Sequence, residues 1–163
     1  MKLLVISDTH IPSRNHFDIS DFLENKDYDL LIHCGDFDTT ATYETIKKIA
    51  WNRLYCVHGN SDEYELKNTL PEMKFWEIDK YKMMIAHWHQ VSNPRWNREW
   101  LVNIALENDA KILFCWHTHR QEIYKYKDWI FLPVNEIKLD DEKCTYVVNP
   151  GTMIRTEFLE IIL

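Results

Sequence analysis

The sequence contains very little glycine: only Gly35, Gly59 and Gly151 occur among its 163 residues. Glycine is the residue that tolerates positive φ angles and close backbone contacts. In a chain with so few, each glycine is expected at a backbone position that a side chain would disturb. Two of the three precede candidate metal-ligand residues, since Gly35 is followed by Asp36 and Gly59 by Asn60.

The sequence also lacks any closely spaced pair of cysteines. Its four cysteines stand at positions 34, 56, 115 and 144, and no C-x-x-C pattern occurs. Three of them lie in or beside apolar runs. We interpret the cysteines as small buried hydrophobic residues of a protein in a reducing cytosol, in preference to disulfides or a thiolate site.

No apolar run approaches the length that spans a bilayer. The first apolar stretch, Met1 to Ile6, is too short for the core of a signal peptide and ends close to Asp8. These features predict a cytoplasmic protein with no membrane partner.

Basic residues are too few for a surface that binds nucleic acid without sequence preference. There are 19 Lys and Arg against 26 Asp and Glu, which gives a formal charge of −7. Nonspecific binding of nucleic acid takes most of its affinity from Lys and Arg contacts with phosphate, so we do not expect it. Phosphate substrates stay open, because bound divalent cations reverse the local field.

The remaining composition is that of a globular protein, with 45% hydrophobic and 28% charged residues. The chain shows no linker, repeat or low-complexity tract. We therefore expect a single domain over residues 1–163.

The first half alternates apolar runs with amphipathic segments. This β-α-β-α-β pattern predicts a parallel sheet layered with helices, in which functional residues collect at the carboxyl ends of the strands. The expected elements are strands at Lys2–Ser7, Leu30–His33 and Arg53–Val57, and helices at Asp18–Leu23 and Thr42–Ala50.

The second half predicts a further sheet. A hairpin is expected from Met73–Ile78 and Tyr81–His87, and a helix within Pro94–Asn108. The inner stripe of that helix is predicted at Trp96, Trp100, Leu101, Ile104 and Ala105. Further strands are expected at Lys111–Cys115, Glu122–Tyr126, Trp129–Leu132, Thr145–Val148 and Phe158–Ile162. The fold class is therefore α/β, with two packed sheets in one domain and helices outside.

Polar clusters rich in metal-ligand types follow several of these runs: Asp8 with His10, Asp36, Asn60, His87 with His89, and His117 with His119. Residues two apart at a strand end are expected to project to the same side. Carboxylate and imidazole together suit Mn, Fe, Zn, Co or Ni. Taken singly, each cluster is equally a cap, a turn or a structural histidine; their recurrence at strand ends favours a metal site.

Six tracts resemble the ordered motifs of the calcineurin-like metallophosphoesterases, and the resemblance extends from residue 2 to about residue 152. It is closest to the small bacterial and archaeal phosphodiesterases, a branch that includes the metallophosphoesterase-fold subunit of the retromer coat. The tracts are Ile6-Ser7-Asp8-Thr9-His10, His33-Cys34-Gly35-Asp36, His58-Gly59-Asn60-Ser61-Asp62, Ala86-His87-Trp88-His89-Gln90, Trp116-His117-Thr118-His119 and Asn149-Pro150-Gly151-Thr152.

This resemblance implies a four-layer α/β/β/α sandwich and a pair of divalent metal ions. One ion is expected on Asp8, His10, Asp36 and His119, and the other on Asp36, Asn60, His87 and His117, with Asp36 bridging. Mn is the expected metal, with Ni, Fe, Zn, Co and Mg as alternatives. The implied reaction is hydrolysis of small phosphodiesters by a hydroxide that bridges the metals, with Asp36, Asn60 and His87 as the catalytic residues.

The sequence departs from the family at the residue after Asn60, which is Ser61 where many larger members have the histidine that protonates the leaving group. His58, Asp62 and His89 are the remaining candidates for that acid. Without a strong acid, substrates with good leaving groups are favoured, which points to activated phosphodiesters.

Trp88 and Trp116 stand where the family usually has glycine. Either their indoles frame the cleft and stack on an aromatic group of the substrate, or strand alternation turns them into the core. We favour the core position.

The alternative to a phosphodiesterase is a scaffold that uses the same fold, with or without metal, to bind proteins, as the retromer subunit does. The resemblance implies that Asp36 and Asn60 distinguish an enzyme from a scaffold. The retromer subunit departs from the catalytic residues at these two positions, whereas this chain retains both. A generic α/β domain with surface histidines is disfavoured by the number of ordered motifs. Exposed aromatic residues leave a homodimer open.

Overall fold

The computed structural model describes residues 1–87, 97–116, 120–139 and 144–163. Its first sheet has four strands in the order β10-β1-β2-β3. These are β1 (Lys2–Ile6), β2 (Leu30–His33), β3 (Leu54–Cys56) and β10 (Leu159–Ile162). The strands β1, β2 and β3 run parallel, whereas β10 closes the sheet antiparallel to β1.

The second sheet has six strands in the order β4-β5-β6-β9-β7-β8. Its centre is parallel, because β5, β6 and β9 run in the same direction, and its flanks are antiparallel. The strands are β4 (Met73–Ile78), β5 (Tyr81–His87), β6 (Ala110–Trp116), β7 (Glu122–Lys127), β8 (Ile130–Pro133) and β9 (Thr145–Asn149).

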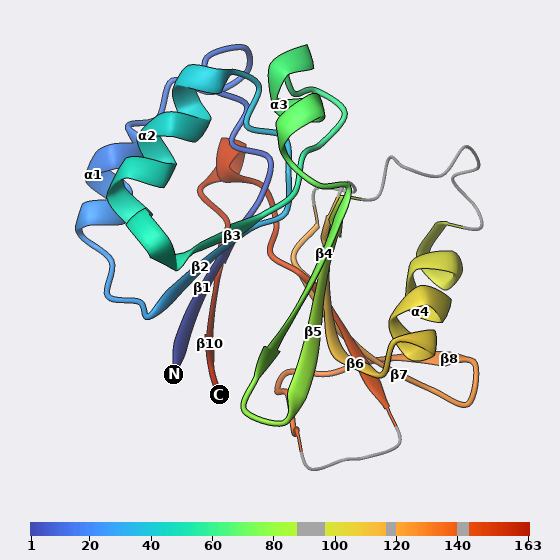
Figure 1. Cartoon of the computed structure of the whole chain (residues 1–163). Helices are drawn as coiled ribbons and strands as arrows, with labels where there is room; N and C mark the ends of the chain where they lie inside the picture. Colours follow the sequence, from blue (N-terminus) through green and yellow to red (C-terminus); the bar gives the residue numbers. More distant parts are fainter. Residues whose placement is uncertain (88–96, 117–119, 140–143) are drawn as a thin grey trace.

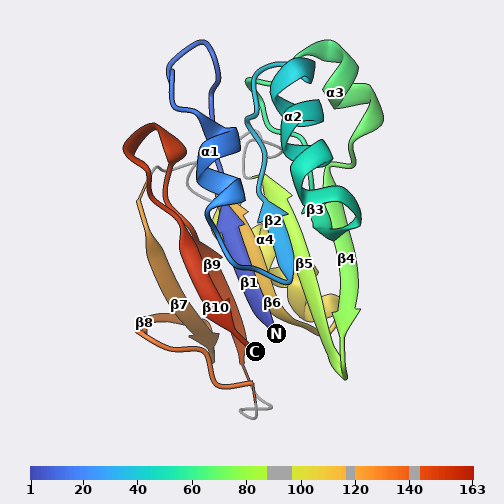
Figure 2. The same cartoon turned by 90° about the vertical axis from the view of Figure 1, so that its left-hand side faces the viewer.

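Helices cover the outer faces of the two sheets (Figure 1). On the side of the first sheet lie α1 (Ile19–Glu24), α2 (Thr40–Ala50) and α3 (Tyr64–Thr69), which Figure 2 shows from outside. On the far side of the second sheet lies α4 (Asn97–Glu107). The described residues also include two 3₁₀ turns, η1 (Trp51–Arg53) and η3 (Met153–Arg155). The four-layer α/β/β/α sandwich expected from the sequence is confirmed.

The helix starts follow from capping side chains. The Asp18 carboxylate accepts the backbone N–H groups of Ser20 and Asp21 and so begins α1. The Thr39 hydroxyl accepts the N–H of Thr42 and begins α2 two residues before the predicted start. The six-residue α3 was not predicted.

The core consists of three apolar layers. Alternation along β1 directs Leu3 and Val5 between the two sheets, and Leu4 and Ile6 toward α1 and α2. A third cluster packs α4 against the outer face of the second sheet. Strands buried on both faces are typical of parallel sheets, which explains why β1 and β2 read as continuous apolar runs.

One predicted helix face is wrong in part. Trp100 is 40% exposed, whereas Leu101, Val102 and Ala105 are fully buried. At 100° per residue these three cluster on one side of α4, and Trp100 lies on the opposite side. The prediction for Trp96 lies outside the described residues.

All four cysteines are buried and none forms a disulfide, as expected. Burial raises the pKa of Cys56 to about 12. Within the described residues, the longest helices have eleven residues, and no helix combines the length and apolarity needed to cross a bilayer.

A buried histidine at the end of β2 joins two loops. The Nδ1 atom of His33 accepts the N–H of Gly35 at 3.2 Å, and its Nε2 lies 3.4 Å from the hydroxyl of Thr9. That hydroxyl in turn donates to the carbonyl of Asp36 at 3.3 Å. The ring also stacks on Phe37, with centroids 3.6 Å apart. His33 is therefore a neutral imidazole that connects the loops following β1 and β2.

Phe114 tests the layer between the sheets. Its ring is fully buried and stacks on Trp76, with centroids 5.9 Å apart. We expect Phe114→Ala to lower the free energy of unfolding by about 3–5 kcal/mol, because it removes buried apolar surface and leaves a cavity. Trp129, which is 80% exposed, is the control: Trp129→Ala should change stability by about 0.5 kcal/mol or less in urea unfolding. Equal losses would contradict this packing.

The pH dependence of stability tests His33. Burial lowers the pKa of His33 to about 3 from its ordinary value of 6.5. Below about pH 6.5 the unfolded chain therefore binds a proton that the folded chain does not, so stability falls as the pH falls toward 3. Between about pH 7 and pH 5, His33 should reduce the free energy of unfolding by about 2 kcal/mol.

The measurement is urea unfolding of the wild type and of His33→Gln at both pH values. The variant keeps a donor and an acceptor but has no group that titrates in this range. Its stability should fall less steeply with acid than that of the wild type. Identical pH dependence would show that His33 is not a buried neutral ring.

Candidate metal centre

The site forms where strands of both sheets end. The parallel strands β1, β2 and β3 present their carboxyl ends at one edge of the first sheet, as parallel strands must. His87 ends β5 of the second sheet, and its Nδ1 lies 2.7 Å from the carbonyl of Cys34 in the loop after β2. The site is therefore built from loops of one sheet and a strand end of the other.

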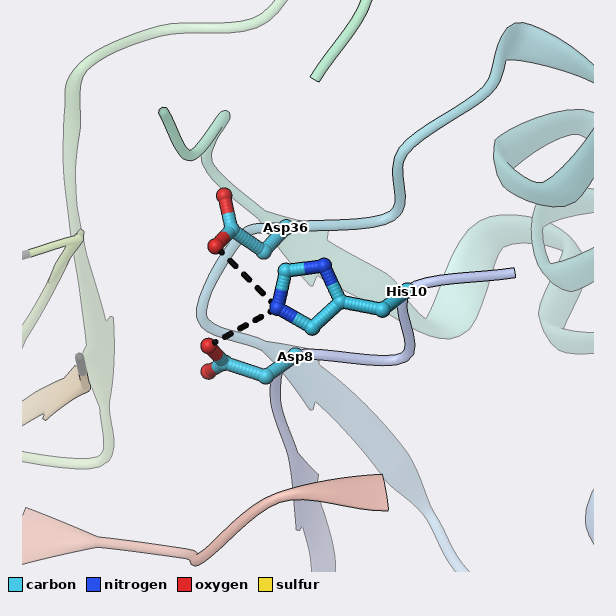
Figure 3. Close-up of side chains that lie close together, drawn as sticks. All are labelled: Asp8, His10 and Asp36. Carbon is cyan, nitrogen blue, oxygen red and sulfur yellow. Dashed lines mark ion pairs between the residues drawn. The ribbon is translucent and has the colours of Figure 1, made fainter. Parts of the chain in front are cut away.

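Three predicted ligands come together in the described structure: Asp8, His10 and Asp36 offer ligand atoms that all lie within 4.8 Å of one another. The Nε2 atom of His10 is 3.4 Å from Oδ1 of Asp8 and 3.4 Å from Oδ2 of Asp36 (Figure 3). All three side chains are buried. Two carboxylates and one imidazole nitrogen directed at a common point are the donor set that binds divalent transition metals.

Asp8 and His10 do converge, but the prediction that strand alternation directs both side chains to the same side is wrong. The strand β1 ends at Ile6, so strand alternation does not set their directions. Instead Asp8, His10 and Asp36 have φ angles of 52°, 47° and 61°, in the left-handed region. Such angles are costly for residues with a side chain and persist where surrounding contacts hold them.

Backbone contacts between the first two loops hold this conformation. The N–H of Asp8 donates to the carbonyl of Gly35 at 3.0 Å, and the N–H of His10 donates to the carbonyl of Asp36 at 3.1 Å. Each ligand of the first loop is thereby anchored to the second.

Asp38 orients His10. Its Oδ1 lies 2.8 Å from Nδ1 of His10. That nitrogen therefore carries a hydrogen and donates a hydrogen bond to the carboxylate. In the neutral ring, the lone pair then resides on Nε2 and faces Asp8 and Asp36. This carboxylate–imidazole pair is the arrangement that surrounds metal-bound histidines. Sequence reasoning missed Asp38; the signal was a second aspartate two residues after Asp36.

The electrostatics of the pocket favour positive charge at His10. Burial lowers the pKa of His10, but hydrogen bonds to Asp8 and Asp38 and the charge of Asp36 outweigh burial, and the pKa is raised overall. An environment that favours a proton on this ring favours a metal cation beside it for the same reason.

The two oxygens of Asp36 have different surroundings. Its Oδ1 accepts the backbone N–H of Ser61 at 2.8 Å. Its Oδ2 accepts the Ser61 hydroxyl at 3.3 Å and lies 3.4 Å from Nε2 of His10 and 3.6 Å from Nε2 of His87. One oxygen is therefore fixed by the third loop, while the other lies between two imidazoles, as a shared ligand would.

His87 and Asn60 form the other side of the site. Because Nδ1 of His87 faces the carbonyl of Cys34, it carries the proton, and the lone pair of the neutral ring is on Nε2. That Nε2 lies 3.2 Å from Oδ1 of Asn60. Two lone-pair atoms thus face each other beside Asp36, which again fits a cation. Asn60 is exposed, whereas His87 is fully buried, so the site opens to solvent at Asn60.

Two glycines permit this close approach, as the sequence predicted. A Cβ atom at Gly35 would lie 2.7 Å from Nδ1 of His87, and the φ of Gly35 is +100°. A Cβ atom at Gly59 would overlap the carboxylate and backbone of Asp36. Larger residues at either position would separate the ligand loops.

The described candidates for a general acid fit that role poorly. Both oxygens of Asp62 accept backbone N–H groups, from Asp38 at 2.9 Å and from Gly59 at 2.7 Å. Burial raises the pKa of Asp62, and those two hydrogen bonds oppose the shift. His58 is buried, with its Nδ1 at 3.4 Å from the carbonyl of Gly59.

Several predicted residues fall outside the described residues: His117 and His119 of the ligand set, His89, Trp88 and the side chain of Trp116. Five of the seven predicted ligands are described, and they occupy one site: Asp8, His10, Asp36, Asn60 and His87.

Known proteins resemble this chain along most of its length. A family model described as the calcineurin-like phosphoesterase superfamily domain matches residues 1–160. A probable metallophosphoesterase of Methanothermobacter thermautotrophicus is 30% identical over 133 residues, which cover 81% of this chain and 74% of that protein. A phosphodiesterase of Methanocaldococcus jannaschii is 22% identical over 180 residues, which cover 100% of this chain and 99% of that protein.

Among solved structures, Vps29 of Entamoeba histolytica in complex with zinc matches with a TM-score of 0.67 and 27% identity, covering 94% of this chain and 76% of that chain. This structural similarity agrees with the fold described above, and the family model covers nearly the whole chain. The chain belongs to the calcineurin-like phosphoesterase superfamily.

Proposed function

We propose that this chain is a metal-dependent phosphodiesterase that hydrolyses small phosphodiesters with two divalent ions. The observation that carries the proposal is the position of Asp36 Oδ2, 3.4 Å from Nε2 of His10 and 3.6 Å from Nε2 of His87. When bound there, two such ions activate a water molecule as nucleophile and neutralise charge on the phosphoryl oxygens.

The ligand assignment follows the two sides of Asp36. Asp8, His10 and Asp36 would hold one ion, and Asp36, Asn60 and His87 the other. His119 and His117 complete the two sets in the prediction from the sequence. Mn is the metal we propose, because a mixed carboxylate, amide and imidazole set suits a borderline divalent ion.

The residues that surround Asp36 also indicate the kind of substrate. Asn60 and Ser61 form the solvent-facing side of the site, while Asp8 and His10 are fully buried. The phosphoryl group would therefore approach along Asn60. Since Asp62 is committed to two backbone N–H groups, substrates whose leaving group departs without strong protonation are favoured. The phosphodiesterase named among the relatives supports a diester substrate.

A second candidate function is a metal-binding scaffold without significant turnover. The similarity to Vps29 with bound zinc favours it, because that protein combines this fold with a metal. The two candidates agree on metal binding and differ on catalysis.

Metal removal and restoration separates these candidates. We expect EDTA-treated protein to lose hydrolysis of bis-(p-nitrophenyl) phosphate and to regain it with Mn, because the ions supply the activated water. Hydrolysis of the monoester p-nitrophenyl phosphate should be slower. Ni, Mg and Zn are tested in parallel. Metal binding in calorimetry without hydrolysis of either ester would support the scaffold instead.

Asp36→Asn tests the shared ligand. Loss of a residue that merely supports a ligand already weakens metal affinity or activity by about 10–100-fold, so loss of a shared carboxylate should reduce kcat/KM by about 100-fold or more. Asp79→Asn is the matched control, since Asp79 is exposed in the turn between β4 and β5. Unchanged activity of Asp36→Asn with Mn present would rule out the two-metal mechanism.

A further inference from the structure

Asp62 connects two loops that carry proposed ligands. It is 3% exposed and lies two residues after Asn60. Its Oδ2 accepts the N–H of Gly59, in its own loop after β3, at 2.7 Å. Its Oδ1 accepts the N–H of Asp38, in the loop after β2, at 2.9 Å. One buried carboxylate thus binds the backbones of both loops.

Other contacts join the same two loops in register. The N–H of Ser61 donates to Asp36 Oδ1 at 2.8 Å, and the N–H of Glu63 donates to the carbonyl of Asp38 at 2.9 Å. Asp62 lies between these two contacts in the sequence. The Ser61 hydroxyl and the Glu63 carboxylate add side-chain contacts, to Asp36 at 3.3 Å and to Thr40 at 2.8 Å. Among these side chains, Asp62 is the buried one that binds backbone N–H groups of both loops, and it thereby helps to set the distance between Asp36 and Asn60.

The chemistry at this position requires a carboxylate. Both of its oxygens face N–H donors, and an asparagine would present its own amide hydrogens to one of them. The carboxylate is also an unfavourable group to bury near Asp36, whose charge raises the pKa of Asp62 further. A group that costs electrostatic free energy is expected where its geometry is needed.

The link continues from Asp38 to the metal site. Asp62 fixes the backbone of Asp38, and the Asp38 side chain faces Nδ1 of His10 at 2.8 Å. The Nε2 atom of His10 then faces Asp8 and Asp36. A shift in the Asp38 backbone would move the carboxylate that sets the direction of His10.

We propose that Asp62 is a positioning residue for the metal centre: it sets the spacing of the two ligand loops and, through Asp38, the orientation of His10. The proposal rests on the metal site of the proposed function but does not require turnover. It assigns Asp62 a role other than that of the leaving-group acid.

The test is direct measurement of Mn²⁺ binding by calorimetry on the EDTA-treated full chain. Asp62→Asn conserves size but loses one of the two backbone contacts, so its Mn²⁺ dissociation constant should rise by about 10–100-fold. Thr145→Val is the matched control. Its hydroxyl is buried and donates to the carbonyl of Ala110 at 3.0 Å, at the amino-terminal end of β9, and its loss should lower Tm but leave Mn²⁺ affinity within about twofold.

A second variant separates position from charge. Asp62→Glu keeps the charge and both acceptor oxygens but lengthens the side chain by one methylene, so it too should bind Mn²⁺ more weakly. Wild-type affinity in Asp62→Glu or in Asp62→Asn would overturn the proposal. The Glu variant also serves if Asp62→Asn does not fold.

The path through Asp38 is tested by a double-mutant cycle. Asp38→Asn should weaken Mn²⁺ binding. The double variant with Asp62→Asn should lose less binding free energy than the sum of the two single losses, because part of the effect of Asp62 reaches His10 through Asp38. Fully additive losses would overturn the path. If the wild type itself binds no Mn²⁺, the proposed metal site fails; if it binds Mn²⁺ but does not hydrolyse diesters, only the proposed function fails.

Discussion

The burial of four carboxylates at one edge of the first sheet is the constraint on which the rest of the site depends. Asp8, Asp36, Asp38 and Asp62 are all at most 6% exposed. Such a cluster of like charges is unfavourable unless donors or cations offset it. Backbone N–H groups and His10 supply part of that compensation, and a donor set of this kind leaves the remainder to divalent metal. The loops, glycines and left-handed φ angles all serve to bring these groups together.

The predictability of the fold followed from its parallel strands. The first three residues of β2, Leu30, Leu31 and Ile32, are all apolar because the strand is buried on both faces. Such runs, and the polar residues after them, could be identified without the structure. The inner face of α4 was predicted less well, because tryptophan counts as apolar in a periodic pattern, whereas Trp100 is 40% exposed. The short α3 carries too few residues for a periodic signal.

The sequence predicted the candidate ligand residues of the site, but it did not predict the residues that hold those ligands in place. Asp8, His10 and Asp36 were found because metal chemistry selects those side chains at strand ends. Asp38 and Asp62 support them through contacts between loops that are 24 residues apart in sequence, and no local spacing reveals such contacts. Left-handed φ angles at Asp8 and His10 are likewise set by tertiary contacts rather than by residue type.

The contacts around Asp36 also bear on the serine that follows Asn60. Many larger members of the family have histidine at this position. Two groups of Ser61 hold Asp36: the backbone N–H donates to Oδ1 at 2.8 Å, and the hydroxyl donates to Oδ2 at 3.3 Å. The backbone contact is available to any residue other than proline at position 61, and serine adds a hydroxyl contact to the same carboxylate. Under the proposed function, the lack of a histidine after Asn60 makes substrate selection depend on how readily the leaving group departs.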